Sequence, residues 1–342
     1  MSHCRFNALW LEMKRNVWRA KKFVLYLRGI SYHNVRQGIG RAYVPGRLDG
    51  YFNDLTAKTT WAGAVNAEGL PLMVTDTGRV FLFPIMLFQL ALGHWDLWLL
   101  SSRRDKLQLD RFLQIADWAA ANLDAQDGWS CWDMIDRGAI DSPYSAMAQG
   151  QGLSVLARAY AEGGDARYAA AAARALAPLV REPSPLKINR RCEGHLIFEE
   201  YPGAMFPAVL NGWIFALFGL QDYGLAFGGA AKGALSESLD GLVAFLPRFD
   251  IGYWSLYDLG GNLAGPFYHQ LHIVQLRALA LTFPGHAKEI ADGIAVFERQ
   301  QASGTCRMRA IAVKIFQKLR SRGISEVMPT KVDGPLASGP SS

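Results

Sequence analysis

Apolar residues recur along most of the chain at intervals of three and four, the spacing that places them on one face of an α-helix. Gly or Pro follows several of these stretches, as expected where helices end. The stretches with this pattern are residues 110–123, 147–165, 166–180, 208–224, 236–249 and 269–283. The pattern therefore predicts a mainly α protein.

The longest apolar run covers residues 81–100 and is long enough to be considered as a membrane span. Pro84, Gln89, His94 and Asp96 interrupt it. A charged group is costly inside a membrane, so we predict a buried helix here and no transmembrane span.

Residues 31–80 have a different pattern, because Gly, Pro, Asn and Asp separate short β-prone pieces such as 40–46 and 70–76. Beyond them, successive helical hairpins with loops between them favour an (α/α) barrel or toroid. We therefore predict three parts, which are a basic lead-in with a β-containing segment at 1–80, an (α/α) toroid at 81–303, and a basic helix with a disordered tail at 304–342.

The charge of the chain indicates the kind of partner. The 342 residues carry a net charge of +6, much of it near the two ends at 13–22 and 306–322. Positive charge suits an anionic partner. No nucleic-acid-binding signature is present, so we expect no nucleic acid among the partners.

The cysteines are scattered along the chain and none forms a CxxC pair. This spacing favours free thiols in a reducing compartment over a zinc site or a disulfide framework. The amino-terminal region lacks a continuous apolar segment followed by a cleavage site, so we expect a cytoplasmic protein, with peripheral membrane contact left open. The four cysteines are Cys4, Cys131, Cys192 and Cys306.

Two glutamines lie among small residues at the start of a predicted helix. Gln149 and Gln151 belong to the sequence DSPYSAMAQGQG, where their amides can face a cleft. Ordinary helix capping by Asp141 or Ser142 is the alternative explanation for the polar character of this stretch.

An acidic pair precedes another apolar helix. Glu199, Glu200 and Tyr201 come directly before Pro202, which favours extended or turn geometry. Adjacent side chains of an extended segment point to different sides, so we expect one carboxylate to face a pocket. Burial would raise its pKa and allow it to act as a base; a solvated acidic turn is the alternative.

Two further stretches combine tyrosine with histidine. Tyr257 follows a Gly-Tyr-Trp turn, and Tyr268, His269 and His272 stand where an apolar run begins. On a helix, Tyr268 and His272 would share a face. The HxxH spacing has no third ligand nearby, so we expect structural histidines and no metal.

Together these motifs resemble those of the D-glucuronyl C5-epimerases. The chain has SPYSAMAQGQG, EEYP followed by VLNGWIFALFGLQDY, YDL and YHQLHIVQL in the order and rough spacing of that family. The resemblance is clearest at 127–281 and extends more loosely back to Gly69. It implies a barrel-like (α/α) domain, no organic cofactor, and conversion of glucuronate to iduronate within heparosan-type chains.

Residue by residue, the resemblance implies that Glu200, Tyr201, Tyr257 and Tyr268 are catalytic. Animal members carry an arginine directly after YDL, where this chain has Gly260. Another basic residue would then recognise the substrate carboxylate. The candidate substrate-binding residues are Gln149, Gln151, Asn211, His269, His272, Arg47, Arg79 and Arg190.

The chemistry of a uronate explains why these residue types are needed. Removal of the C5 proton leaves an enediolate, which positive charge and hydrogen-bond donors must stabilise. Inversion requires one group to remove the proton and another to deliver one on the opposite face. We expect Glu200 and Tyr268 to fill these two parts, with Tyr201 and Tyr257 binding the sugar or relaying protons.

Other functions stay open at this point. A polysaccharide lyase would remove the same proton and then expel the C4 oxygen. A glycoside hydrolase would need two carboxylic acids, one of them from Asp133, Asp136 or Asp141. Aromatic loops and positive charge would also suit a non-catalytic binder of an anionic, uronate-containing polysaccharide, and a helical scaffold would need none of these groups. The pattern leaves a homodimer open as well.

Overall fold

The computed structural model describes residues 35–60, 63–75, 78–135, 140–203 and 207–320, with side chains to residue 317. The basic stretch at 13–22, Cys4, Asp136 and the tail at 332–342 lie outside these residues. Among the helices described, none is both long and apolar enough to cross a membrane.

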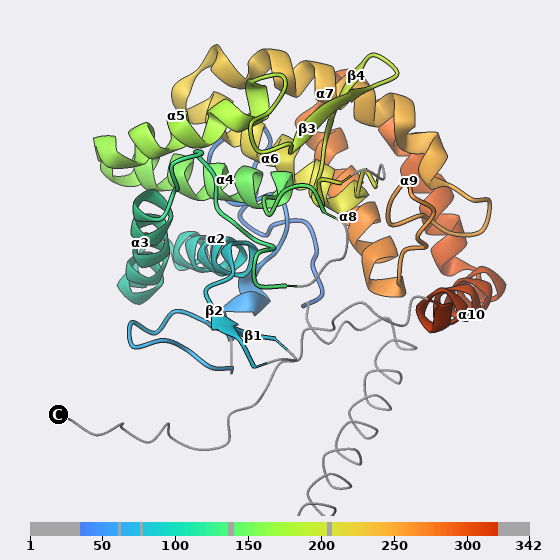
Figure 1. The fold of residues 1–342 in the computed structure, drawn as a ribbon, viewed down its shortest axis with the longest axis horizontal. Coiled ribbons are helices and arrows are strands. Elements are labelled where there is room, and N and C mark those ends of the chain that lie inside the picture. Colours follow the sequence, from blue (N-terminus) through green and yellow to red (C-terminus); the bar gives the residue numbers. More distant parts are fainter. Residues whose placement is uncertain (1–34, 61–62, 76–77, 136–139, 204–206, 321–342) are drawn as a thin grey trace, which may run out of the picture.

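Helices make up most of the described chain (Figure 1). The α-helices are α2 (Pro84–Leu100), α3 (Lys106–Ala121), α4 (Ala146–Gly163), α5 (Ala166–Val180), α6 (Leu210–Phe227), α7 (Lys232–Phe245), α8 (Pro266–Thr282), α9 (Ala287–Ala302) and α10 (Gly304–Arg320). The short 3-10 helices are η1 (Thr56–Thr60), η2 (Gly229–Ala231), η3 (Leu246–Phe249) and η4 (Pro284–His286). The strands form two antiparallel hairpins, β1 (Met73–Val74) with β2 (Val80–Phe81), and β3 (Asn189–Cys192) with β4 (His195–Phe198).

The helices pack in pairs that form two rows. One row is α2, α4, α6 and α8, in which α4 packs against α2 and α6, and α6 packs against α8. Their partners α3, α5, α7 and α9 lie beside them in the same order. Side chains of α4 and α6 are buried nearly all the way round, whereas α3, α5 and α9 bury one face. The mainly α prediction is confirmed, and closure of the rows into a barrel stays a prediction.

Two glycines allow α4 and α6 to touch through their backbones. A Cβ on Gly150 would lie 2.5 Å from the carbonyl oxygen of Phe215, and one on Gly219 would lie 2.2 Å from that of Gly150. Any larger residue would push the helices apart. This contact fixes the distance between the two helices that carry the start of the candidate site.

A buried ion pair joins the segment before α2 to the helices. Arg158 on α4 and Asp222 on α6 are fully buried, with Nη1 and Oδ2 2.5 Å apart. The same guanidinium donates to the carbonyl oxygens of Asp49 and Gly50, at 3.1 and 3.2 Å. A buried charge needs this many partners to offset its lost hydration.

Aromatic packing strengthens this junction. The ring of Phe52 stacks on Phe218 with centroids 4.0 Å apart, and Tyr51 contacts Phe215 and Phe218 at 6.4 and 6.3 Å. Residues of the amino-terminal segment therefore share one hydrophobic core with the helices. The boundary we predict at residue 80 stays a prediction.

The predicted helices are present, with small differences at their ends. The apolar run at 81–100 is the buried helix α2. The stretch at 236–249 divides into the end of α7 and the 3-10 helix η3, where Pro247 follows Leu246. The β-prone piece at 40–46 forms turns instead of a strand, and the hairpin β3–β4, which the sequence pattern did not predict, precedes the acidic pair.

Candidate active site

The hairpin β3–β4 delivers the Glu-Tyr motif to the start of α4. Strand β4 ends at Phe198, and the backbone N–H of Glu199 donates to the carbonyl oxygen of Ile188 at 2.8 Å. The carbonyl oxygen of Glu199 accepts from the N–H of Ala146 at 2.9 Å. The loop is thus held on both sides by backbone hydrogen bonds before any side chain contributes.

Glu199 is one of two adjacent carboxylates with different surroundings. It is 2% exposed, its Oε1 lies 2.9 Å from Nε of Arg190, and its Oε2 accepts from the N–H of Ala208 at 3.1 Å. Burial raises its pKa from 4.5 to about 7, although Arg190 and the Ala208 hydrogen bond act in the opposite direction. Glu199 therefore exchanges a proton near neutral pH.

Glu200 lies against the first turn of α6. Its Oε2 is 3.5 Å from Nδ2 of Asn211, and its side chain is buried. A Cβ at Gly212 would lie only 2.5 Å from Oε2, so glycine is required there for the carboxylate to fit. The backbone oxygen of Glu200 accepts from the indole of Trp132 at 3.0 Å.

The tyrosines of the three motifs meet beside Glu200. The rings of Tyr257 and Tyr268 are edge to face with centroids 4.8 Å apart. Tyr257 is hydrogen-bonded to Tyr201, and its pKa is raised well above its ordinary value by burial and then by the nearby Glu200, Tyr201 and Tyr268. Residues far apart in sequence therefore form one cluster, which we call the Glu-Tyr cluster: Glu200, Tyr201, Tyr257 and Tyr268.

A tight hairpin positions Tyr257. Its N–H donates to the carbonyl oxygen of Asn262 at 2.6 Å. The carboxylate of Asp258 accepts from the backbone and the side-chain amide of Asn262, at 3.1 and 2.8 Å. Helix α8 then begins at Pro266, so Tyr268 lies in its first turn. The Asp-Leu-Gly-Gly-Asn sequence is thus the turn that brings Tyr257 back towards Tyr268.

Helix α10 fastens this hairpin from outside. The N–H of Leu263 donates to Oε1 of Gln317 at 3.1 Å, and Nε2 of Gln317 donates to the carbonyl oxygen of Gly261, also at 3.1 Å. Ala310 packs in a small apolar cluster with Trp254 and Leu263, and this cluster also contacts Tyr257 and Tyr268. A helix remote in sequence therefore supports the tyrosines.

His269 and His272 lie behind the cluster and are fully buried. Nε2 of His269 is 3.0 Å from the carbonyl oxygen of Phe297, so this nitrogen carries the proton. Its Nδ1 then accepts from Oγ of Ser255 at 2.8 Å, and His272 Nδ1 lies 3.1 Å from the same hydroxyl. Burial lowers their pKa values to about 4 and about 3, so both rings are neutral and hold the hairpin.

The two glutamines of α4 differ. Both amide protons of Gln149 have backbone partners, the carbonyl oxygens of Asp127 and Ala175 at 2.7 and 2.8 Å. Gln151 is fully buried, and within the described residues its amide has no hydrogen-bond partner. Neither side chain bonds to the Glu-Tyr cluster in the described chain, so their role in binding substrate stays a prediction.

The three candidate arginines lie in different places. Arg47 is exposed and paired with Asp49 at 2.7 Å. Arg79 is exposed beside the hairpin of β1 and β2. Arg190 is the one that joins the Glu-Tyr motif, because it pairs with Glu199, the neighbour of Glu200.

Sequence reasoning missed several residues that hold the site. Trp132 bonds to Glu200 and its ring lies 4.7 Å from that of Tyr201. Gln317 belongs to the carboxy-terminal helix, which the sequence marked only by its charge. Asn262 could have been found, since Asp, Gly and Asn are typical turn residues and the sequence from Asp258 to Asn262 contains all three.

The described residues contain no group of three or more His, Cys, Asp or Glu side chains that could hold a metal ion. The cysteines in this part of the chain, Cys131, Cys192 and Cys306, are free thiols. The arrangement offers a carboxylate and three phenols, which can move protons and donate hydrogen bonds to a substrate.

Comparison with known proteins gives the same family as the motifs. The family described as D-glucuronyl C5-epimerase C-terminus matches residues 135–291. A D-glucuronyl C5-epimerase of Caenorhabditis elegans is 31% identical over 194 residues, which cover 49% of this chain and 32% of the relative. An uncharacterized protein of Methanocaldococcus jannaschii is 35% identical over 136 residues, 38% of this chain and 44% of the relative.

The chain therefore spans less than half the length of either relative. The matched region begins before α4 and ends in α9, so it includes all four residues of the Glu-Tyr cluster. It leaves out α2, α3 and α10, although these helices pack on it. Residues 135–291, a little under half of the chain, are therefore similar to the D-glucuronyl C5-epimerase family.

Proposed function

We propose that the protein is a uronate C5-epimerase, which converts D-glucuronate to L-iduronate within a heparosan-like polysaccharide. The observation that carries this proposal is the meeting of Glu200, Tyr201, Tyr257 and Tyr268, which come from three separate segments. The family match supports epimerase chemistry in general. A heparosan-like polymer is what the resemblance of the motifs implies, and the net charge of +6 suits an anionic chain.

The reaction needs a base and an acid on opposite faces of C5. The base removes the C5 proton, and the electron pair of the C–H bond moves into the carboxylate to form an enediolate. The acid then gives its proton to C5 from the other side. We assign these parts to Glu200 and Tyr268, because a buried carboxylate is a competent base and a phenol is a proton donor that a carbanion can deprotonate.

Turnover leaves the base protonated and the acid deprotonated, so a path must restore both. Tyr257 lies between Tyr201 and Tyr268 and near Glu200. Its raised pKa keeps the phenol protonated at neutral pH, so it can donate to the enediolate or to a neighbouring phenolate. In our proposal Tyr201 and Tyr257 transfer the protons that restore the base and the acid, and they bind the sugar.

Recognition of the substrate carboxylate falls to Arg190 in this proposal. Of the three candidate arginines, it is the one paired with the neighbour of Glu200. With the pKa of Glu199 at about 7, protonation of that carboxyl would release the guanidinium for a substrate anion. The same site could serve a lyase, which would use the same proton abstraction. The assay must therefore distinguish an epimerised product from a cleaved one.

The test is incubation of the protein with heparosan in heavy water, followed by NMR of the product. The proposal expects deuterium at a saturated C5 together with iduronate signals. An unsaturated, shortened product would establish a lyase instead. Absence of both exchange and cleavage would refute epimerisation of this polymer.

Variants then test the residue assignments. Glu200→Gln and Tyr268→Phe should each reduce the formation of iduronate by at least about 100-fold while much of the binding is retained, because inversion needs both groups. Tyr160→Phe is the matched control, because that tyrosine packs against Phe227 at the far end of α4. Normal formation of iduronate in either site variant would remove that residue from the mechanism.

A further inference from the structure

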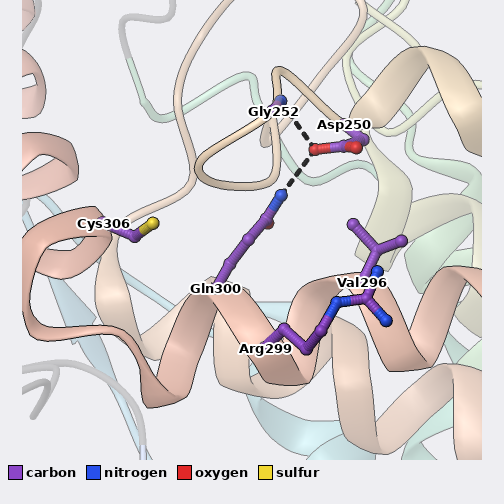
Figure 2. A pocket seen from close by; sticks show the side chains of 6 residues that line it. All are labelled: Asp250, Gly252, Val296, Arg299, Gln300 and Cys306. Atoms are coloured by element: carbon purple, nitrogen blue, oxygen red, sulfur yellow. Dashed lines mark hydrogen bonds between the residues drawn. The ribbon is translucent and has the colours of Figure 1, made fainter.

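A hollow lies between the loop after η3 and the helices α9 and α10 (Figure 2). Its volume is about 330 Å³, the size of a small-molecule site. The residues that line it are Asp250, Gly252, Val296, Arg299, Gln300 and Cys306. None of them belongs to the Glu-Tyr cluster.

The hollow presents hydrogen-bond acceptors with a defined orientation. Oδ1 of Asp250 accepts from Gly252 N–H at 2.8 Å and from Nε2 of Gln300 at 2.6 Å (Figure 2). The amide of Gln300 must therefore turn its nitrogen towards the carboxylate of Asp250, which leaves Oε1 pointing away from that carboxylate. Gln300 is 6% exposed, and Oε1 has no donor among the described residues. A buried acceptor without a donor is costly, so a ligand with hydroxyl groups would satisfy it.

The same hollow contains an unpaired cation. Arg299 forms no ion pair within the described chain, whereas its neighbour Glu298 is taken by Arg277 at 2.6 Å. A guanidinium binds carboxylate or sulfate through two parallel hydrogen bonds. Val296 adds an apolar surface of the kind that covers the C–H face of a sugar. Hydroxyl donors and one anionic group on a small ring are the properties of a sugar acid.

Helix α10 gives the distance from the hollow to the Glu-Tyr cluster. Cys306 lines the hollow, and Gln317 bonds to the hairpin of Tyr257. Their separation of eleven positions corresponds to about 16 Å along the helix. This distance is the length of a few sugar rings, so one polysaccharide chain can reach both places.

We infer that the hollow is a distal subsite for an anionic sugar of the polysaccharide whose reactive uronate occupies the Glu-Tyr cluster. Gln300 Oε1 and the second oxygen of Asp250 accept from its hydroxyls, and Arg299 binds its carboxylate or sulfate. This inference rests on the proposed function for the nature of the polymer. It makes affinity depend on chain length.

The experiment is calorimetric titration of the protein with a heparosan trisaccharide and a heparosan decasaccharide. Arg299→Ala is the main variant, since an exposed side chain can be removed without unfolding the protein. It should weaken decasaccharide binding about fivefold and change trisaccharide binding less than twofold. Arg299→Lys should fall in between, because it keeps the charge and loses the paired hydrogen bonds.

Arg104→Ala is the matched control, because this exposed arginine lies between α2 and α3, across the molecule from α9 and α10 (Figure 1). Unchanged decasaccharide affinity in Arg299→Ala, or an equal loss for both oligosaccharides, would overturn the subsite. Binding that depends on Arg299 without deuterium exchange at C5 would keep the subsite and refute the epimerase. Deuterium exchange at C5 together with binding that does not depend on Arg299 would keep the epimerase and refute the subsite.

Discussion

The carboxyl group of Glu199 makes the stability of the protein depend on pH in a defined window. Its pKa rises from 4.5 in an unfolded chain to about 7 in the folded protein, mainly because it is buried. Between these two values the folded protein holds one proton more than the unfolded chain. Its contribution to stability is therefore complete below pH 4.5 and is lost as the pH rises through about 7.

The magnitude follows from the difference between the two pKa values. It corresponds to about 3 kcal/mol of unfolding free energy between pH 4.5 and about 7. The variant Glu199→Gln keeps the shape of the side chain and removes the titration. As the pH rises from about 5 to about 7.5, the unfolding free energy of the variant should fall by about 2 kcal/mol less than that of the wild type, because part of the titration lies outside this range.

Urea unfolding at the two pH values measures this difference. Asp96→Asn is an informative control, because burial also raises the pKa of Asp96 to about 7 and this group lies at the junction with Tyr51 instead. Its effect should add to that of Glu199→Gln, since the two sites are separate. Parallel pH profiles for the wild type and Glu199→Gln would show that Glu199 titrates normally and would refute the argument.

Three further outcomes follow from contacts in the fold. Gly150→Ala should lower stability by about 1–3 kcal/mol in thermal unfolding, because its Cβ would lie 2.5 Å from a backbone oxygen; Gly163→Ala, where the space is open, should be nearly neutral. Asp222→Asn should cost about 3–5 kcal/mol in urea unfolding, because it leaves Arg158 buried without its anion; a small loss would mean that the guanidinium is solvated. Gln317→Ala should lower kcat for C5 exchange about tenfold with KM nearly unchanged, because the hairpin of Tyr257 loses two hydrogen bonds; a change in KM alone would assign Gln317 to substrate binding.

The helices were predictable because they depend on the spacing of apolar residues and on end signals within one short stretch of the chain. The run at 81–100 carries Pro84 at its first helical position and is interrupted by polar groups, and the structure has α2 there, largely buried. The hairpin β3–β4 was not predictable in the same way, because its four-residue strands carry Arg and His as well as apolar residues. Its pairing depends on the turn at Glu193 and Gly194, both with positive φ.

The residues of the candidate site were also predictable only in part. Motif order led to Glu200, Tyr201, Tyr257 and Tyr268, and the structure brings these four together. The sequence could not choose among the three arginines, because the choice depends on how β3 pairs with β4. It also could not reveal Gln317, because no periodicity links a residue on one helix to a backbone carbonyl fifty-six positions earlier.

The buried pair of Arg158 and Asp222 limits how the protein can be divided. Its guanidinium takes two of its partners from the backbone at Asp49 and Gly50, and Phe218 takes its stacking partner from Phe52. A chain cut to the family region, residues 135–291, would expose the ring of Phe218 to water. It would also remove two of the hydrogen-bond acceptors of the buried Arg158. We therefore expect that the boundary of sequence similarity is not a folding boundary, and that the shortest unit that folds on its own begins before Asp49.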